Sequence, residues 1–294
     1  RTTEILEIKG GTALMKEKVK HKYKPYEWAL LVLTAVIAII MIYPVLFALM
    51  SAFKSNGEIL KNPAAPPTAL YFKNFVDLFQ MSDFAGAIIN TVFLTVLSEA
   101  LIICVVPMAA FAITRDHSKK SAFFYTFFIS GMMIPFHLYM FPLFKELKMF
   151  GMFGNFIGPI MIYISGSIAF GSLLYCSFLK GVPLELEEAA MLDGYNRFQI
   201  FWLITFPLLG PCNASMIILN GLNIWNDYLM PYLVLPSGKA KTITVEIAGF
   251  VGQFTARWDI VFAGTLISMI PAIIIFVAFQ KYFVKGVTAG ATKG

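Results

Sequence analysis

Residues 180–211 read KGVPLELEEAAMLDGYNRFQIFWLITFPLLGP and lie between two long apolar stretches of the chain. Pro183 suits a first helical turn, and the Glu residues that follow it favour the positive end of a helix dipole. Gly194 permits the backbone conformation that ends a helix. Asn196 can then cap a second helix, with Gln199 in the position of a capping-box partner. The stretch therefore predicts a polar helical hairpin between two apolar spans, on which another protein can dock.

The composition requires lipid as the solvent. Of the 294 residues, 58% are hydrophobic and 14% are charged. A water-soluble fold of this length could not bury so much apolar surface, so the sequence predicts an all-α membrane protein. The net charge is +6, but Lys and Arg cluster at the ends of apolar segments, which favours membrane orientation over nucleic-acid binding. The three Cys have no CxxC spacing and the three His are scattered, so no metal site is predicted.

Six apolar segments are long enough to cross a bilayer, which requires about 20 residues each. They lie at about residues 28–53, 84–113, 121–144, 153–179, 201–225 and 260–283. The predicted organisation is an N-terminal tail of residues 1–25, a six-span domain of residues 26–283, and a C-terminal tail of residues 284–294. The hairpin, residues 181–207, forms the loop between spans four and five, and its second helix merges with the start of span five.

The distribution of Lys and Arg predicts the orientation of these spans. With both termini in the cytoplasm, 15 of the 23 Lys and Arg residues fall on the inner side and 8 on the outer side, as the positive-inside rule requires. This topology places the hairpin in the cytoplasm. The first apolar segment is too long for a typical signal peptide, so we expect it to be retained as a span.

The hairpin resembles the signature loop of the permease subunits of bacterial ATP-driven (ABC) importers. The family pattern is Glu-Ala-Ala, a Gly four residues after the second Ala, and then an Ile and a Leu-Pro pair. It is matched here by Glu188, Ala189, Ala190, Asp193, Gly194, Ile204 and Pro207, with Phe206 in place of the Leu. The resemblance implies that these residues, with Glu187, form coupling helices that sit in a cleft of a cytoplasmic ATPase. The acidic residues alone would equally suit an ordinary cytoplasmic loop.

Other segments narrow the resemblance to the smaller, six-span permease of the maltose-type carbohydrate importers. They are residues 109–115, Pro135, Pro142 with Leu143, residues 225–228, residues 231–233 and the tail at 283–294. In that family the tail is expected to reach the ATPase dimer. Its candidate contacts here are Lys285, Gly286, Thr288 and Gly290, and a frayed terminus is the alternative.

The resemblance also implies a set of partners in the bacterial cytoplasmic membrane. The chain is expected to form a heterodimeric pore with a second homologous permease, to bind two cytoplasmic ATPase subunits, and to receive an oligosaccharide from an extracytoplasmic sugar-binding protein. No GxxxxGK[ST] loop occurs in the sequence, so ATP and Mg²⁺ would be bound by the ATPase subunits. We therefore expect a non-catalytic subunit with no cofactor of its own.

Four polar residues inside the predicted spans are candidates for a translocation path. Glu99 lies near the middle of span two, where an ionised carboxylate is costly. A second set, spaced i, i+3 and i+7, shares one helical face: Asn220, Asn223 and Asp227. This face must contact protein or water, because its polar side chains would have no hydrogen-bond partners in lipid. Either a sugar path or hydrogen bonding between helices accounts for them. Three residues of span four are instead expected to permit close helix packing: Gly166, Gly171 and Ser172.

Two other classes of function fit the sequence less well than a permease does. An ion-coupled secondary transporter could use Glu99 as its proton-linked group, but inverted repeats and several intramembrane carboxylates would be expected, and neither is evident. An intramembrane enzyme would need a His/Asp, Ser/Lys or metal-ligand grouping at mid-span depth, which the sequence lacks.

Overall fold

The computed structural model describes residues 24–235, 240–252 and 256–291, with side chains as far as Ala278. The chain divides into two compact units, residues 1–49 and residues 50–294. The first unit contains most of α1 (Pro25–Ala52), an apolar helix long enough to cross a membrane. The candidate sites all lie in the second unit.

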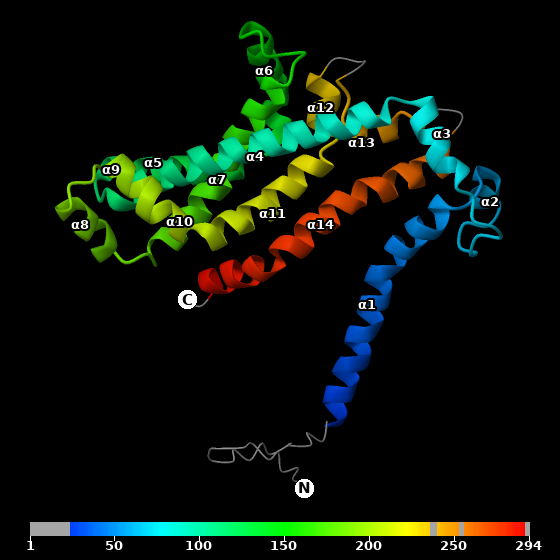
Figure 1. The fold of residues 1–294 in the computed structure, drawn as a ribbon, viewed down its shortest axis with the longest axis horizontal. Coiled ribbons are helices and arrows are strands. Elements are labelled where there is room, and N and C mark those ends of the chain that lie inside the picture. Colours follow the sequence, from blue (N-terminus) through cyan, green and yellow to red (C-terminus); the bar gives the residue numbers. More distant parts are fainter. Residues whose placement is uncertain (1–23, 236–239, 253–255, 292–294) are drawn as a thin grey trace, which may run out of the picture. The chain divides into compact units, whose positions relative to one another are not determined.

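Four helices form the centre of the second unit: α4 (Phe84–Arg115), α7 (Ile157–Leu179), α11 (Gly210–Asn226) and α14 (Trp258–Ala291). α7 packs against α4, and α11 lies between α4 and α14 (Figure 1). Gly171 makes the first contact possible, because a Cβ there would lie 2.4 Å from Val106 Cγ1. The predicted packing role of Gly171 is thus confirmed. Gly166 has open space around its Cβ position, so it makes no such close contact among the described residues of this chain.

Two of the expected spans are bent helix pairs rather than single helices. At 121–144 the structure has α5 (Lys119–Ser130), the short turn η1 (Gly131–Met133) and α6 (Phe136–Met149), with a bend of 106°. The bend follows from Pro135, which has no amide hydrogen and restricts the backbone of the residue before it. In the region of 201–225, α11 meets the segment before it at a bend of 74°.

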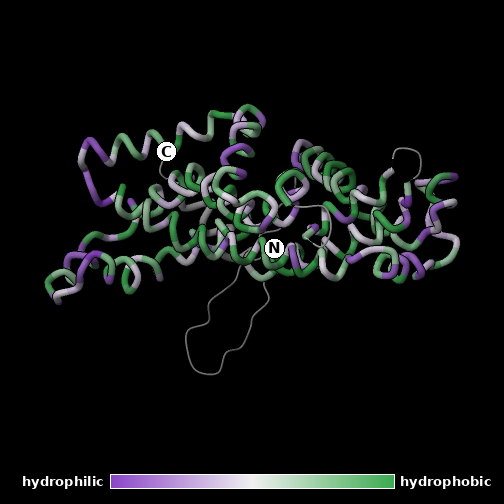
Figure 2. Tube along the Cα trace, turned by 90° about the horizontal axis from the view of Figure 1, so that it is seen from above, coloured by the Kyte–Doolittle hydropathy of each residue, from purple (hydrophilic) through white to green (hydrophobic). Residues whose placement is uncertain are grey.

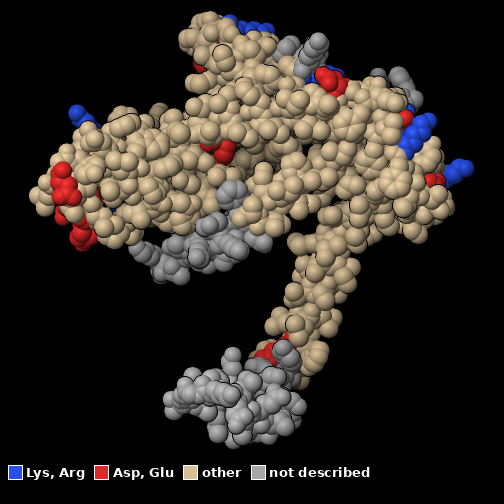
Figure 3. Space-filling view, viewed as in Figure 1, with Lys and Arg blue, Asp and Glu red and all other residues tan. Residues whose placement is uncertain are grey.

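The described residues therefore contain four helices long and apolar enough to cross a membrane, or six if each bent pair is one span. Hydrophobic residues predominate between the two ends of the second unit (Figure 2), and its charged side chains gather at those ends and on the projecting α6 (Figure 3). Both patterns are typical of a helical membrane protein.

Short helices occupy the two ends of this unit. Toward one end lie α2 (Asn56–Lys61), α3 (Lys73–Met81) and α13 (Ile243–Ala248), which contact the first turns of α4 or α14, while α12 (Leu229–Val234) follows α11. At the other end lie α8 (Glu185–Leu192), α9 (Arg197–Ile200), the π-helical turn η2 (Phe201–Thr205) and α10 (Phe206–Leu208) (Figure 1). The second group is the predicted hairpin.

Candidate functional site

The hairpin has the predicted caps. Gly194 adopts a φ of +88° after α8, a conformation that glycine reaches without steric cost. Asn196 Oδ1 accepts a hydrogen bond from the Gln199 amide at 2.9 Å, and Gln199 Oε1 accepts one from the Asn196 amide at 2.9 Å. α8 begins at Glu185, two residues after Pro183. Local sequence signals therefore build a helix, a tight turn and a second capped helix.

The outer surface of the hairpin is apolar and acidic. Leu192 is 91% exposed, and α8 also carries exposed acidic side chains at this end of the unit (Figure 3). The exposed large apolar residues of the hairpin are Leu184, Leu186, Met191, Leu192, Tyr195, Phe198 and Leu203. Of the predicted coupling residues, those exposed are Glu188, Ala189, Asp193, Gly194 and Pro207. Such a patch is typical of a protein-interaction surface.

Three of the predicted coupling residues face the interior instead. Glu187 is 1% exposed and Ala190 is 5% exposed. Ala190 belongs to the main apolar core, which lies among α4, α7 and α11, and Ile204 packs against that core while partly exposed. These side chains hold the hairpin on the helices beneath it, and the outward set is left free to meet another protein.

Glu187 is held by Arg115, the last residue of α4. Arg115 Nε lies 3.0 Å from Glu187 Oε1 and 2.9 Å from Oε2, and Arg115 Nη2 lies 2.7 Å from Oε1. The same guanidinium donates to the carbonyls of Leu179 at 3.2 Å and Val182 at 3.4 Å. Thr205 Oγ1 donates to Glu187 Oε1 at 3.2 Å. We call this set of contacts the Arg115–Glu187 clasp.

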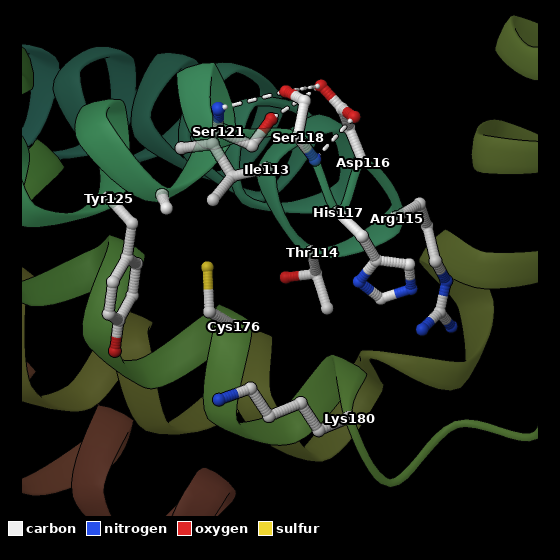
Figure 4. Close-up of a pocket in the computed structure, with 11 residues that line it drawn as sticks. Ile113, Thr114, Arg115, Asp116, His117, Ser118, Ser121, Tyr125, Cys176 and Lys180 are labelled. Carbon is white, nitrogen blue, oxygen red and sulfur yellow. Dashed lines mark hydrogen bonds between the residues drawn. The ribbon is translucent and has the colours of Figure 1, made fainter.

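A pocket of about 480 Å³ opens beside the clasp, between the end of α4, α5 and the end of α7. In Figure 4, Tyr125 and Cys176 lie on one side, His117 and Arg115 on the other, and Lys180 below. The hydroxyls of Ser121 and Ser118 donate to the Asp116 carboxylate at 2.7 and 2.8 Å. These bonds hold the pKa of Asp116 below its usual range. The Asp116 carboxylate thus links the end of α4 to the first turn of α5.

A larger groove of about 1130 Å³ is formed by residues of α5, η1, α6, α7, α11 and α12. Its apolar lining includes Phe127, Phe128, Met132, Phe136, Tyr139 and Phe170, and its polar lining includes Tyr163, Ser165, Ser167, Asn220, Asn223, Asn226 and Asp227. Three of the four predicted path residues, Asn220, Asn223 and Asp227, thus lie along one groove. Glu99 is not among the lining residues.

Glu99 is connected to the groove through Asn220. It is 6% exposed at the centre of α4, and Asn220 Nδ2 lies 3.4 Å from its Oε2 and 2.7 Å from Ser167 Oγ. Glu99 Oε1 is buried without a hydrogen-bond partner among the described residues. Ser167 Oγ donates to the carbonyl of Tyr163 at 2.6 Å. Asn220 therefore both bonds between helices and lines the groove, so the two interpretations of this face are compatible.

Some residues of these sites were missed in the sequence. Tyr163 and Ser167 lie one helical turn apart on α7, and this i, i+4 spacing was the signal that could have found them. In the sequence, Arg115 was considered only as part of the segment 109–115 that carries the family resemblance. Its partner lies 72 residues later, so no local pattern could identify the pair.

The predicted tail contacts lie outside the described side chains. The backbone at Lys285, Gly286, Thr288 and Gly290 continues α14, which extends to Ala291 beyond the span end expected at residue 283.

Residues 106–289 match a family model described as "Binding-protein-dependent transport system inner membrane component". The chain is 34% identical over 270 residues to the "Probable starch degradation products transport system permease protein AmyC" of Thermoanaerobacterium thermosulfurigenes, covering 91% of this chain and 97% of that protein. It is 32% identical over 263 residues to the melibiose/raffinose/stachyose import permease MelC of Bacillus subtilis, covering 89% and 95%.

Among solved structures, the chain resembles one from a bacterial ABC transporter that imports the acidic polysaccharide alginate. The TM-score is 0.76 at 22% identity, over 90% of this chain and 100% of that chain. Nothing in these comparisons supports an ion-coupled carrier. The chain belongs to the inner membrane component family of binding-protein-dependent transport systems, and it is a permease subunit of a carbohydrate importer.

Proposed function

We propose that the groove is this subunit's half of an oligosaccharide path. One observation carries the proposal: amide, hydroxyl and carboxylate groups from α7 and α11 face a cavity whose other walls are aromatic and aliphatic. A sugar presents hydroxyl groups at its edges and apolar C–H faces, so such a mixed lining suits it. A second, homologous permease would supply the other half, and the six spans would include the two bent pairs.

The lack of a positively charged side chain among the described lining residues of the groove supports an uncharged sugar. Among the described residues that line it there is no Lys, Arg or His, and the one carboxylate is that of Asp227. A carboxylated sugar would leave its charge unpaired in such a lining, which is costly. The relatives named above are described as importers of starch products and of raffinose-type sugars, which are uncharged.

The hairpin is proposed to dock on a cytoplasmic ATPase subunit, with the exposed residues from Glu188 to Gly194 at the contact. Its exposed apolar surface supports this role. The Lys and Arg distribution supports a cytoplasmic hairpin and cytoplasmic termini in a bacterial inner membrane. Two ATPase subunits would bind ATP and Mg²⁺, and this chain would be non-catalytic. Closure of the ATPases would then move the hairpin and shift the pore between two states.

A binding protein outside the membrane would deliver the sugar. A similar chain, 23% identical with a TM-score of 0.65, was solved as part of an alginate transporter in complex with a periplasmic protein carrying an alginate pentasaccharide. The candidate contacts of the C-terminal tail, from Lys285 to Gly290, would meet the ATPase dimer.

The test is to purify the chain from its native membrane, identify the proteins that accompany it, and reconstitute the complex in liposomes. We expect an ATPase and a second permease to co-purify, and uptake to persist when the proton gradient is collapsed but to stop when ATP is removed. Uptake that follows the proton gradient and ignores ATP would overturn the proposal.

A further inference from the structure

We propose that Arg115 is a positioning residue for transport, because its ion pair with Glu187 fastens the hairpin to both helical walls of the groove. The inference rests on the proposed coupling role of the hairpin. It concerns the inward face of α8, whereas docking would use the outward face.

Four helical segments and one connection meet at this ion pair. Glu187 belongs to α8 and Arg115 ends α4. The guanidinium also binds the carbonyl of Leu179, the last residue of α7, and that of Val182 in the connection to α8. Thr205 in the π-helical turn completes the set by donating to the Glu187 carboxylate. No other acidic side chain of α8 makes such contacts among the described residues.

The burial of the pair makes it a rigid connection. The Glu187 side chain is 2% exposed and the Arg115 side chain is 15% exposed, with Nη2 and Oε1 2.7 Å apart. A bidentate guanidinium–carboxylate pair fixes relative orientation as well as distance. Removing one partner leaves a buried charge unpaired, so the arrangement resists local opening. By contrast, Glu185 and Glu188 on the same helix are exposed.

The clasp connects the hairpin to the groove through two helical segments. One route follows α7 from Leu179 back to Ser167 and Tyr163, which line the groove. The other follows the chain from Thr205 through α10 into α11, which carries Asn220. π-Helical turns are rare and often occur at functional sites. A displacement of α8 would therefore reach both walls together.

The experiment uses the assembled transporter with its partner subunits, in a cysteine-free background. Spin labels at Leu138 on α6 and Leu219 on α11, neither of which lines the groove, report the separation of these two helices across it. Labels at Arg197, an exposed hairpin residue outside the proposed contact from Glu188 to Gly194, and at Ile157 report the position of the hairpin relative to α7. Distances are measured without nucleotide and after trapping with ATP and vanadate. The variants are Glu187→Gln, Arg115→Lys and the exposed control Glu185→Gln.

In the wild type and in Glu185→Gln we expect a nucleotide-dependent shift in groove distance and one narrow hairpin distance. In Glu187→Gln we expect the groove shift to be lost and the hairpin distance to broaden, while nucleotide trapping persists. Arg115→Lys keeps the charge but loses the bidentate geometry, so it should assemble and show the same loss. It therefore serves as the test if Glu187→Gln does not assemble.

A wild-type groove shift that survives in the clasp variants, with a narrow hairpin distance, would overturn this inference and leave the coupling role intact. Absence of any shift in the wild type would instead count against the proposed function itself.

Discussion

The hydroxyl of Tyr163 lies 2.8 Å from Asp227 Oδ2 and joins α7 to the end of α11 across 64 residues of sequence. The other oxygen, Asp227 Oδ1, accepts the amide of Leu229 at 2.9 Å at the start of α12. One carboxylate thus fixes three elements at the wall of the groove. Asp227 is better described as a structural part of the path than as a free charge within it.

Replacing Tyr163 by Phe should loosen this wall. The change leaves Asp227 Oδ2 without its donor, and an unsatisfied partly buried acceptor costs about 1–3 kcal/mol. We expect a lower melting temperature in detergent and weaker sugar transport. The matched control is Tyr139→Phe, because Tyr139 lines the same groove and its hydroxyl has no hydrogen-bond partner among the described residues. Equal effects of the two changes would contradict the role given to the Tyr163–Asp227 bond.

Replacing Glu99 by Gln should leave transport nearly unchanged, within about twofold. An amide oxygen can accept the bond from Asn220 as the carboxylate does. Glu99→Lys should prevent accumulation of the folded protein, since it buries an unpaired charge at several kcal/mol. ATP-driven uptake in liposomes and the amount of protein in the membrane measure the two effects. A carrier that moved protons through Glu99 would instead lose its activity in the Gln variant.

Gly194 should tolerate Ala far better than Pro. Its φ is +88° and a Cβ there would meet nothing within 4 Å, so Ala costs only backbone strain of about 1–2 kcal/mol. Pro cannot adopt this φ, and the turn between α8 and α9 must then rearrange. We expect Gly194→Pro, like Glu188→Lys on the outer face, to insert into the membrane but to uncouple uptake from ATP hydrolysis. Gly57→Ala, with similar open space and no positive φ, is the control, and normal uptake by Gly194→Pro would exclude the turn from coupling.

The contact between α4 and α7 can be tested with two glycines of the same helix. Gly171→Ala places a Cβ 2.4 Å from Val106 Cγ1, and overpacking of this kind costs about 1–3 kcal/mol. Gly166→Ala meets open space and should have little effect. Thermal unfolding in detergent measures both. A similar loss of stability in the two variants would contradict the role given to close packing at Gly171.

The parts of this molecule that depend on local chemistry were predictable. The stop at Gly194, the cap at Asn196 and the shared face of Asn220 and Asp227 follow from residues a few positions apart. The bend before α6 was not predicted, although Pro135 had been noted in the sequence. A proline within a span can cause a sharp kink, but a span can also continue through a proline with little change of direction. The sequence could not show that Glu187 faces inward and Glu188 outward. The difference between these adjacent residues depends on the ion pair of Glu187 with Arg115, which is distant in the sequence.

Substitutions of Asn223, which lies exposed in the groove, can test whether the transported sugar is charged. If the path carries uncharged sugar, Lys and Asp at this position should both impair ATP-driven uptake by about tenfold, because the amide both donates to and accepts from sugar hydroxyls, whereas Lys can only donate and Asp can only accept. Asn223→Gln, which keeps the amide, should stay within about twofold of the wild type. The same three variants give a different pattern for an acidic sugar, since Lys would then pair with the cargo and Asp would repel it. Uptake that survives Lys but fails with Asp would therefore reverse the assignment of an uncharged substrate.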